Sequence, residues 1–346
     1  MINLTLPQKY QKRLNLLDNS HLNTIIPMYL TQRLNPNYVR ERLITPDNDF
    51  IDLDWVNKDK TDAPLVVLFH GTEGSSKSHY AKRIMYYLES MGWCGVVPHF
   101  RGCSGELNWQ PRFYHLGDTS DITWILEQLK SRNYEQVFAI GVSLGGNAIL
   151  KFLGENTQQE LVNAAMAISV PYDLATSAKT LDQGFNKHVY VKHFLSTLLP
   201  KMEKYAKQFG NVKLAEHKID TLDEFNSTYI CQFYDFKDVT DYYQKTSCRP
   251  YLIHITTPTL LLQAANDPMV PIDSWPTKAE LSKSIRFVAT KTGGHGGFIN
   301  LTTNYKEALL KLPKFIVQYF SQYTENYSAY PDQFNQEEID FITEQG

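Results

Sequence analysis

The chain of 346 residues is poor in cysteine, and its cysteines lie far apart. They form neither a C-x-x-C pair nor the dense framework of a small disulfide-stabilised domain. We therefore expect free thiols, buried as small core residues, in a protein of a reducing compartment such as the cytoplasm. The four are Cys94, Cys103, Cys231 and Cys248.

The sequence also lacks long apolar runs and any strong excess of charge. No window approaches the roughly 18 apolar residues of a membrane span, and the first 20 residues do not resemble a signal peptide. A formal net charge of −3 gives no field that would gather nucleic acid or an anionic membrane. A cytoplasmic protein without a nucleic-acid partner or a transmembrane segment is expected.

What the sequence does contain is a series of short apolar runs separated by helical patterns. Continuous apolar runs predict strands that are buried on both faces, as in a parallel sheet covered by crossover helices. Residues 50–56 alternate instead, which favours an antiparallel edge strand. The buried strands are expected at residues 64–70, 95–100, 136–142, 164–170, 259–265 and 285–290.

About 85 residues separate the fourth of these runs from the fifth, which is far more than one crossover helix needs. We expect a helical cap there. Within it, residues 189–209 place apolar side chains on one helical face and Lys201, Lys204 and Lys207 elsewhere, on a solvated face. Peripheral membrane contact through this helix is the less favoured alternative. The predicted organisation is an N-terminal extension (1–45), a core (46–171 and 257–325), a cap or lid (172–256) and a C-terminal tail (326–346).

A G-x-S-x-G motif is centred on Ser143, directly after a predicted strand and directly before a helical run. This context is typical of a nucleophilic serine on a strained strand-to-helix turn. The turn leaves little room for side chains, and Gly141 and Gly145 suit it. The alternative is a glycine-rich turn in which Ser143 only caps the helix.

A nucleophilic serine needs a histidine to take its proton and a carboxylate to orient that histidine. His295 lies in a loop with four glycines, which let the backbone bend toward a second loop. Asp267 ends a predicted strand, where α/β sheets place their chemistry. Three competing interpretations are that Asp273 is the acid, that Asp267 only forms a turn, or that His295 is an exposed loop residue.

Acyl transfer also requires backbone N–H groups that bind the developing oxyanion. We expect them from Leu144, after the nucleophile, and from Thr72, in the loop after the first buried strand, with Glu73 as the alternative to Thr72. Residues 74–78 lack the spacing of a phosphate loop, and no H-E-x-x-H motif occurs. No cofactor and no metal are expected.

A series of ordered stretches stands out at residues 21–25, 70–74, 95–105, 114–121, 139–146, 236–243, 266–268 and 293–295. Together they resemble the YheT-type branch of the α/β-hydrolases, bacterial predicted esterases similar to eukaryotic abhydrolase-domain lipases. The resemblance covers about residues 15–320. It implies an α/β-hydrolase fold, with a mostly parallel eight-stranded sheet flanked by helices and a helical cap, and a triad that falls on Ser143, Asp267 and His295. His99 is expected to anchor loops rather than to act in catalysis.

These observations predict a serine hydrolase that cleaves small-molecule or lipid carboxylic esters through an acyl-enzyme. A noncatalytic ligand-binding module with the same fold is one alternative. A thioesterase, an amidase or an acyltransferase could use the same triad, although the H-x-x-x-x-D motif of some acyltransferase relatives is absent.

Overall fold

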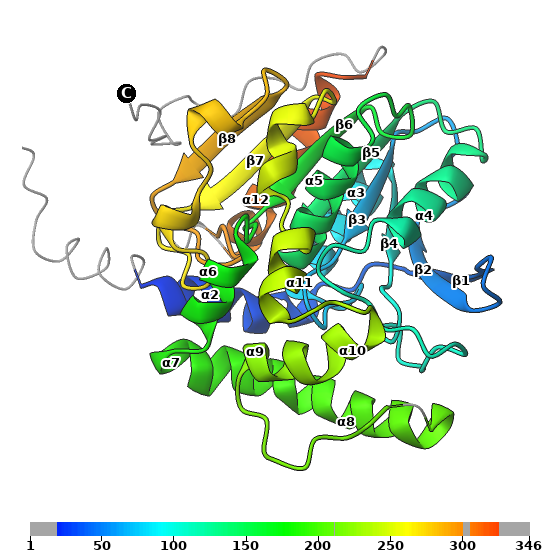
Figure 1. Ribbon diagram of the computed structural model, residues 1–346. Coiled ribbons are helices and arrows are strands. Elements are labelled where there is room, and N and C mark those ends of the chain that lie inside the picture. The colour runs from blue at the N-terminus through cyan, green and yellow to red at the C-terminus, as the bar shows by residue number, and fades with distance from the viewer. Residues whose placement is uncertain (1–18, 211, 300–304, 325–346) are drawn as a thin grey trace, which may run out of the picture.

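A computed structural model describes residues 19–210, 212–299 and 305–324 of the chain. An eight-stranded sheet lies at its centre, with the strand order β1-β2-β4-β3-β5-β6-β7-β8 (Figure 1). The pairings from β4 through β8 are parallel, and β1 and β2 are antiparallel, so the predicted mostly parallel sheet is confirmed. The strands are β1 (Val39–Ile44), β2 (Phe50–Val56), β3 (Leu65–Phe69), β4 (Cys94–Pro98), β5 (Val137–Val142), β6 (Ala164–Ile168), β7 (Thr259–Ala264) and β8 (Ile285–Thr290).

The strand at residues 50–56 is antiparallel as expected, but the prediction that it forms an edge is wrong. β1 pairs along its whole length and takes the edge position. Arg40 lies opposite Asp54, and Arg42 lies opposite Asp52, each with its Nε 2.7 Å from a carboxylate oxygen of its partner. The two arginines of β1 therefore neutralise carboxylates of β2 that would otherwise have to be hydrated, and this allows β2 to be buried.

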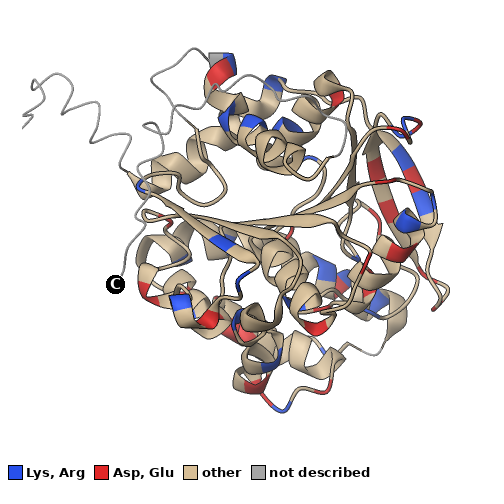
Figure 2. Cartoon of the chain, turned by 90° about the horizontal axis from the view of Figure 1, so that it is seen from above, with Lys and Arg blue, Asp and Glu red and all other residues tan. Residues whose placement is uncertain are grey.

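Helices cover both faces of the sheet, which Figure 2 shows from above as a largely uncharged band between two layers. α4 and α5 contribute to the apolar core on one face, together with Val67 and Ala139, and α3 and α12 to the core on the other, with Val66 and Ile140. No helix in the described ranges is both long enough and apolar enough to cross a bilayer. The helices that precede β6 are α2 (Ser20–Leu30), the short η1 (Thr31–Arg33), α3 (His79–Met91), α4 (Ser120–Lys130) and α5 (Leu144–Glu155), and α12 (Tyr305–Ser321) follows β8.

The segment between β6 and β7, called the insertion below, is helical, and its helices α7 to α10 gather at one end of the sheet (Figure 1). The apolar face predicted within residues 189–209 is confirmed, since Leu195, Leu198, Met202 and Tyr205 are buried. The predicted tail, residues 326–346, lies outside the described residues. The insertion contains α6 (Leu174–Leu181), α7 (Gly184–Asn186), η2 (Lys187–Val191), α8 (Lys192–Phe209), α9 (Leu222–Phe225), η3 (Asn226–Ile230), α10 (Cys231–Phe233), α11 (Val239–Thr246) and η4 (Arg249–His254); η5 (Ile272–Ser274) and η6 (Lys278–Glu280) follow β7.

The four cysteines are free thiols, as expected. Cys94, Cys231 and Cys248 are buried, and Cys103 is half-buried. Burial raises the pKa of the Cys103 thiol to about 12, so the thiol is protonated and unreactive near neutral pH.

Candidate active site

Ser143 occupies the sharp turn between β5 and α5, with φ 55° and ψ −118°. This backbone conformation is strained for any residue other than glycine. A β-carbon at Gly145 would lie 2.2 Å from the carbonyl oxygen of Phe69, and one at Gly141 would lie 2.4 Å from that of Gly145. Only glycine fits at these two positions, because the turn is pressed against β3 and against itself.

His295 and Asp267 contact each other across two loops that follow β8 and β7. The His295 Nδ1 lies 2.9 Å from one carboxylate oxygen of Asp267 and 3.1 Å from the other. The Asp267 side chain is fully buried, and its Oδ1 also accepts from the N–H groups of Met269 and Val270. Asp273, the rival acid, lies in η5 and is not a hydrogen-bond partner of His295. The predicted pairing of His295 with Asp267 therefore exists in the structure.

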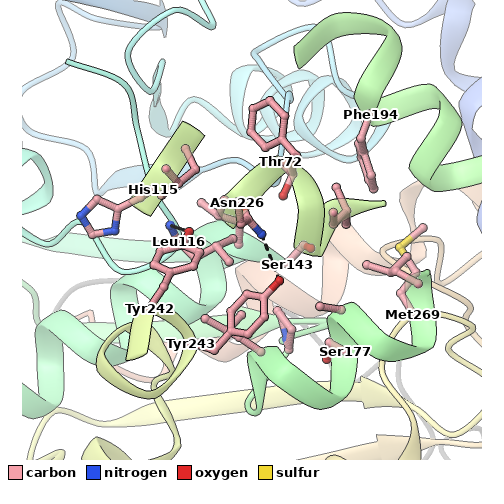
Figure 3. A pocket seen from close by; sticks show the side chains of 18 of the residues that line it. Thr72, His115, Leu116, Ser143, Ser177, Phe194, Asn226, Tyr242, Tyr243 and Met269 are labelled. Atoms are coloured by element: carbon pink, nitrogen blue, oxygen red, sulfur yellow. Dashed lines mark hydrogen bonds between the residues drawn. The ribbon is translucent and has the colours of Figure 1, made fainter. Parts of the chain in front are cut away.

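Ser143 and His295 line the same two adjoining cavities, and Thr72 lies at both. The first, called the apolar cavity, is enclosed mostly by side chains of the insertion. Figure 3 shows Ser143 among the side chains that line it, and the dashed line there joins Asn226 to Tyr243, which are hydrogen-bonded at 3.0 Å. Its apolar lining includes Leu174, Ala178, Leu181, Leu198, Phe225, Ile230 and Met269.

The second cavity, called the polar cavity, lies between α2, the start of α3, and the segment of the insertion formed by η2 and the start of α8. Lysine, histidine and hydroxyl side chains border it, although most of its lining surface is apolar, as it is in the neighbouring cavity. Ser143 stands where the two cavities meet, so a bound molecule with one apolar and one polar part can span it. The polar lining includes Thr24, Gln32, Lys77, Ser78, Lys82, Tyr190 and His193.

The two amides expected to bind an oxyanion border the cavity that holds Ser143. Leu144 is the first residue of α5, so its N–H has no helical acceptor. Thr72 lies in the loop after β3. The alternative donor, Glu73, already gives its N–H to the hydroxyl of Tyr114 at 3.0 Å. Because Tyr114 takes the N–H of Glu73, Thr72 remains the candidate donor in this loop.

A buried ion pair beside this loop had no signal in the sequence. The Lys201 Nζ lies 2.7 Å from Oε1 of Glu73, which also accepts from the Tyr114 hydroxyl at 2.9 Å. The side chain of Lys201 is only 19% exposed, so its expected place on a solvated helix face is wrong. The reason is that a carboxylate from a loop of the core reaches α8 and offsets the cost of burying the ammonium group.

Two other histidines near the site hold loops in place. The His99 Nε2 accepts from the N–H of Ser76 at 3.3 Å and lies 3.3 Å from a carboxylate oxygen of Asp54, in line with the expected anchoring role. The His70 Nε2 accepts from the N–H of Phe100 at 3.1 Å, and burial lowers the pKa of His70 to about 3. Within the described ranges, no three or more His, Cys, Asp or Glu residues cluster in a way that could hold a metal ion.

Comparison with known proteins places this geometry in a family. Residues 64–300 match the family described as alpha/beta hydrolase fold. The chain is 33% identical to the putative esterase YheT of Escherichia coli, over 87% of this chain and 91% of that protein. It is 27% identical to human phospholipase ABHD3, over 80% of this chain and 70% of that protein. A serine hydrolase of Cycloclasticus zankles has a similar fold, with a TM-score of 0.56 at 14% identity, covering 84% of this chain and all of that one. The chain belongs to the α/β-hydrolase fold family and, within it, to the YheT-type branch.

Proposed function

We propose that this protein is a serine hydrolase that cleaves carboxylic esters, with Ser143 as the nucleophile. The proposal rests on two observations: His295 is paired with Asp267, and a serine held in a strained turn lines the same two cavities as His295. A hydrolase also agrees with the names of the relatives, a putative esterase and a phospholipase.

In this mechanism the Ser143 Oγ attacks the ester carbonyl carbon while the His295 Nε2 takes its proton. Asp267 holds the imidazole by its Nδ1–H and stabilises the imidazolium. The N–H groups of Thr72 and Leu144 bind the oxyanion of the tetrahedral intermediate. The intermediate collapses as His295 returns the proton to the leaving alcohol. Water, activated by the same histidine, then attacks the acyl-enzyme and releases the acid, so the mechanism calls for no cofactor.

The two cavities suggest how the substrate divides at Ser143. The acyl chain enters the apolar cavity, where each buried methylene contributes about 0.8 kcal/mol. The alcohol part lies in the polar cavity, beside His295, which must protonate it on departure. The insertion then acts as a cap over the acyl chain. A lipid ester, with one long apolar arm and one polar head, fits this division.

A series of p-nitrophenyl esters of increasing acyl length tests the proposal on wild type and on Ser143→Ala. Wild type is expected to turn over the esters, and Ser143→Ala to lose at least about a thousandfold in kcat while remaining folded. A fluorophosphonate probe is expected to label wild type at Ser143 only. A folded wild type that is neither labelled nor active would make the protein a noncatalytic binding module. Faster turnover of matched thioesters or amides would show that these, rather than esters, are the preferred substrate class.

A further inference from the structure

The N-terminal helix α2 reaches the loop that carries His295, although about 270 residues separate them. The Oγ1 of Thr24 accepts a hydrogen bond from the N–H of His295 at 3.0 Å. The same hydroxyl donates to the carbonyl of Ser20 at 2.8 Å, so its orientation is fixed. Thr24 is 5% exposed, and this contact is largely shielded from water.

The glycines of the His295 loop are packed against this helix. A β-carbon at Gly297 would lie 2.1 Å from the carbonyl oxygen of Asn23, and one at Gly294 would lie 2.7 Å from the N atom of Thr24. The sequence suggested only that these glycines allow the loop to bend. The structure adds that two of them allow the loop to pass within van der Waals distance of α2.

On α3, a buried arginine holds the same loop. Arg83 has no exposed surface, and its guanidinium donates to the carbonyls of Gly297 at 2.8 Å and Gly296 at 2.9 Å. Burial lowers the pKa of Arg83 to about 9. None of the ion pairs among the described residues involves Arg83. Burying a cation without a carboxylate is costly. The two charge-assisted hydrogen bonds offset part of this cost, and they fix two consecutive carbonyls next to His295.

The geometry points to Thr24 and Arg83 as positioning residues for His295, which makes α2 a part of the active site. This inference rests on the proposed function, in which His295 is the general base. A glycine-rich loop is intrinsically free to move, and a displacement of about 1 Å of a catalytic group can cost about a hundredfold in rate. Thr24 from α2 and Arg83 from α3 restrict that movement without touching the substrate's reacting atoms.

Thr24→Val is the sharpest test, because valine keeps the shape of threonine but cannot accept the hydrogen bond. We expect kcat to fall about tenfold or more while KM stays within about twofold, and the rate of fluorophosphonate labelling to fall by the same factor. Thr24→Ser restores the hydroxyl and is expected to recover most of the rate. Thr259→Val is the matched control, since Thr259 is equally buried but lies at the start of β7, at the strand end away from Asp267. Its kcat should stay at the wild-type value.

Arg83→Lys is a second arm that does not depend on the folding of the Thr24 variants. Lysine keeps the charge, but its compact ammonium lacks the planar fork that reaches both carbonyls, so kcat is expected to fall by a similar factor. The inference is overturned if folded Thr24→Val or Arg83→Lys is as fast as wild type, or if Thr24→Ser is as slow as Thr24→Val. A wild type that is neither labelled nor active would instead overturn the proposed function, and this inference with it.

Discussion

The ammonium group of Lys201, on α8 of the insertion, lies 2.7 Å from the carboxylate of Glu73 in the loop that follows β3. Glu73 is adjacent to Thr72, one of the two proposed oxyanion donors, and its side chain is only 5% exposed. The ion pair therefore joins α8, which contributes to the wall of the apolar cavity, to the loop that is proposed to bind the oxyanion.

Lys201→Met is expected to lower the free energy of unfolding by about 3 kcal/mol, because it leaves the buried carboxylate of Glu73 without its cation. Urea unfolding measures this directly. Lys201→Met/Glu73→Gln removes both charges and should lose less than Lys201→Met alone. Lys204→Met is the control, because Lys204 is exposed on the same helix. Equal losses for Lys201→Met and Lys204→Met would show that the ion pair contributes nothing measurable.

Asp267→Asn is expected to lower kcat by about three to four orders of magnitude with little change in KM. An amide can donate to the Nδ1 of His295 and so stabilise the wrong tautomer of the ring. Steady-state kinetics on a p-nitrophenyl ester provides the measurement. Asp273→Asn should remain within about twofold of wild type, and the opposite ranking of the two variants would assign the acid to Asp273.

Ser143→Gly is expected to be more stable than Ser143→Ala by about 1 kcal/mol, although both variants should be inactive. Glycine adopts the φ of 55° found at this position without strain, whereas alanine retains the strain of serine. Both variants lack the serine hydroxyl, so the difference in their stability reports the backbone strain at this position. Thermal or urea unfolding that ranks alanine above glycine would show that the turn relaxes when the nucleophile is absent.

Ala178→Phe is expected to shift the preference of the enzyme toward short acyl chains. Ala178 lies on α6 and lines the apolar cavity, so a phenyl ring there would exclude part of a long chain. Loss of four buried methylenes would cost about 3 kcal/mol, or roughly a hundredfold in kcat/KM for a decanoyl ester. The acetyl ester is the internal control and should change little. An unchanged length profile would place the acyl chain outside this cavity.

Acid should destabilise the fold through histidines that are neutral in the folded protein. Burial lowers the pKa of His115 from 6.5 to about 4, with Arg112 and Lys151 acting in the same direction and Asp118 opposing them. Between these pH values the unfolded chain binds a proton that the folded protein does not. The free energy of unfolding therefore falls as pH drops below 6.5, by up to about 1.4 kcal/mol per pH unit for this residue.

His115→Gln tests this contribution in urea unfolding at pH 7, 6 and 5. The variant should show a smaller loss of stability on acidification than wild type, by up to about 1.4 kcal/mol per pH unit. His70, whose pKa burial lowers to about 3, contributes in the same direction and should remain effective in the variant. Identical pH dependence in the two proteins would mean that His115 is protonated before unfolding.

The strands that were predicted from sequence are those whose burial leaves a local signal. β3, β5 and β6 are apolar at nearly every position because helices cover both of their faces. β1 gave no such signal, since its sequence VRERLI is charged and half-exposed. It forms a strand because Arg40 and Arg42 find acids on β2, a relationship that only the pairing of the two strands creates.

The residues of the candidate site also fall into those with a local signal in the sequence and those without one. Ser143 lies in a motif, and Asp267 and His295 follow strands in the order that the fold requires, so local pattern was enough to select them. Lys201 and Thr24, in contrast, contact residues that are 128 and 271 positions away along the chain. A lysine off the apolar face of a helix and a threonine within a helix have no local feature that predicts such partners.

The insertion enters the chain between β6 and β7, whereas Ser143, Asp267 and His295 follow β5, β7 and β8. Most of the walls proposed to contact the acyl chain are thus encoded in a different stretch of the gene from the groups proposed to break the ester. On the proposed function, mutations of the insertion residues that line the apolar cavity would alter which esters are accepted while the reacting groups stay fixed. Selection could therefore give the members of such a branch different substrates without rebuilding their chemistry.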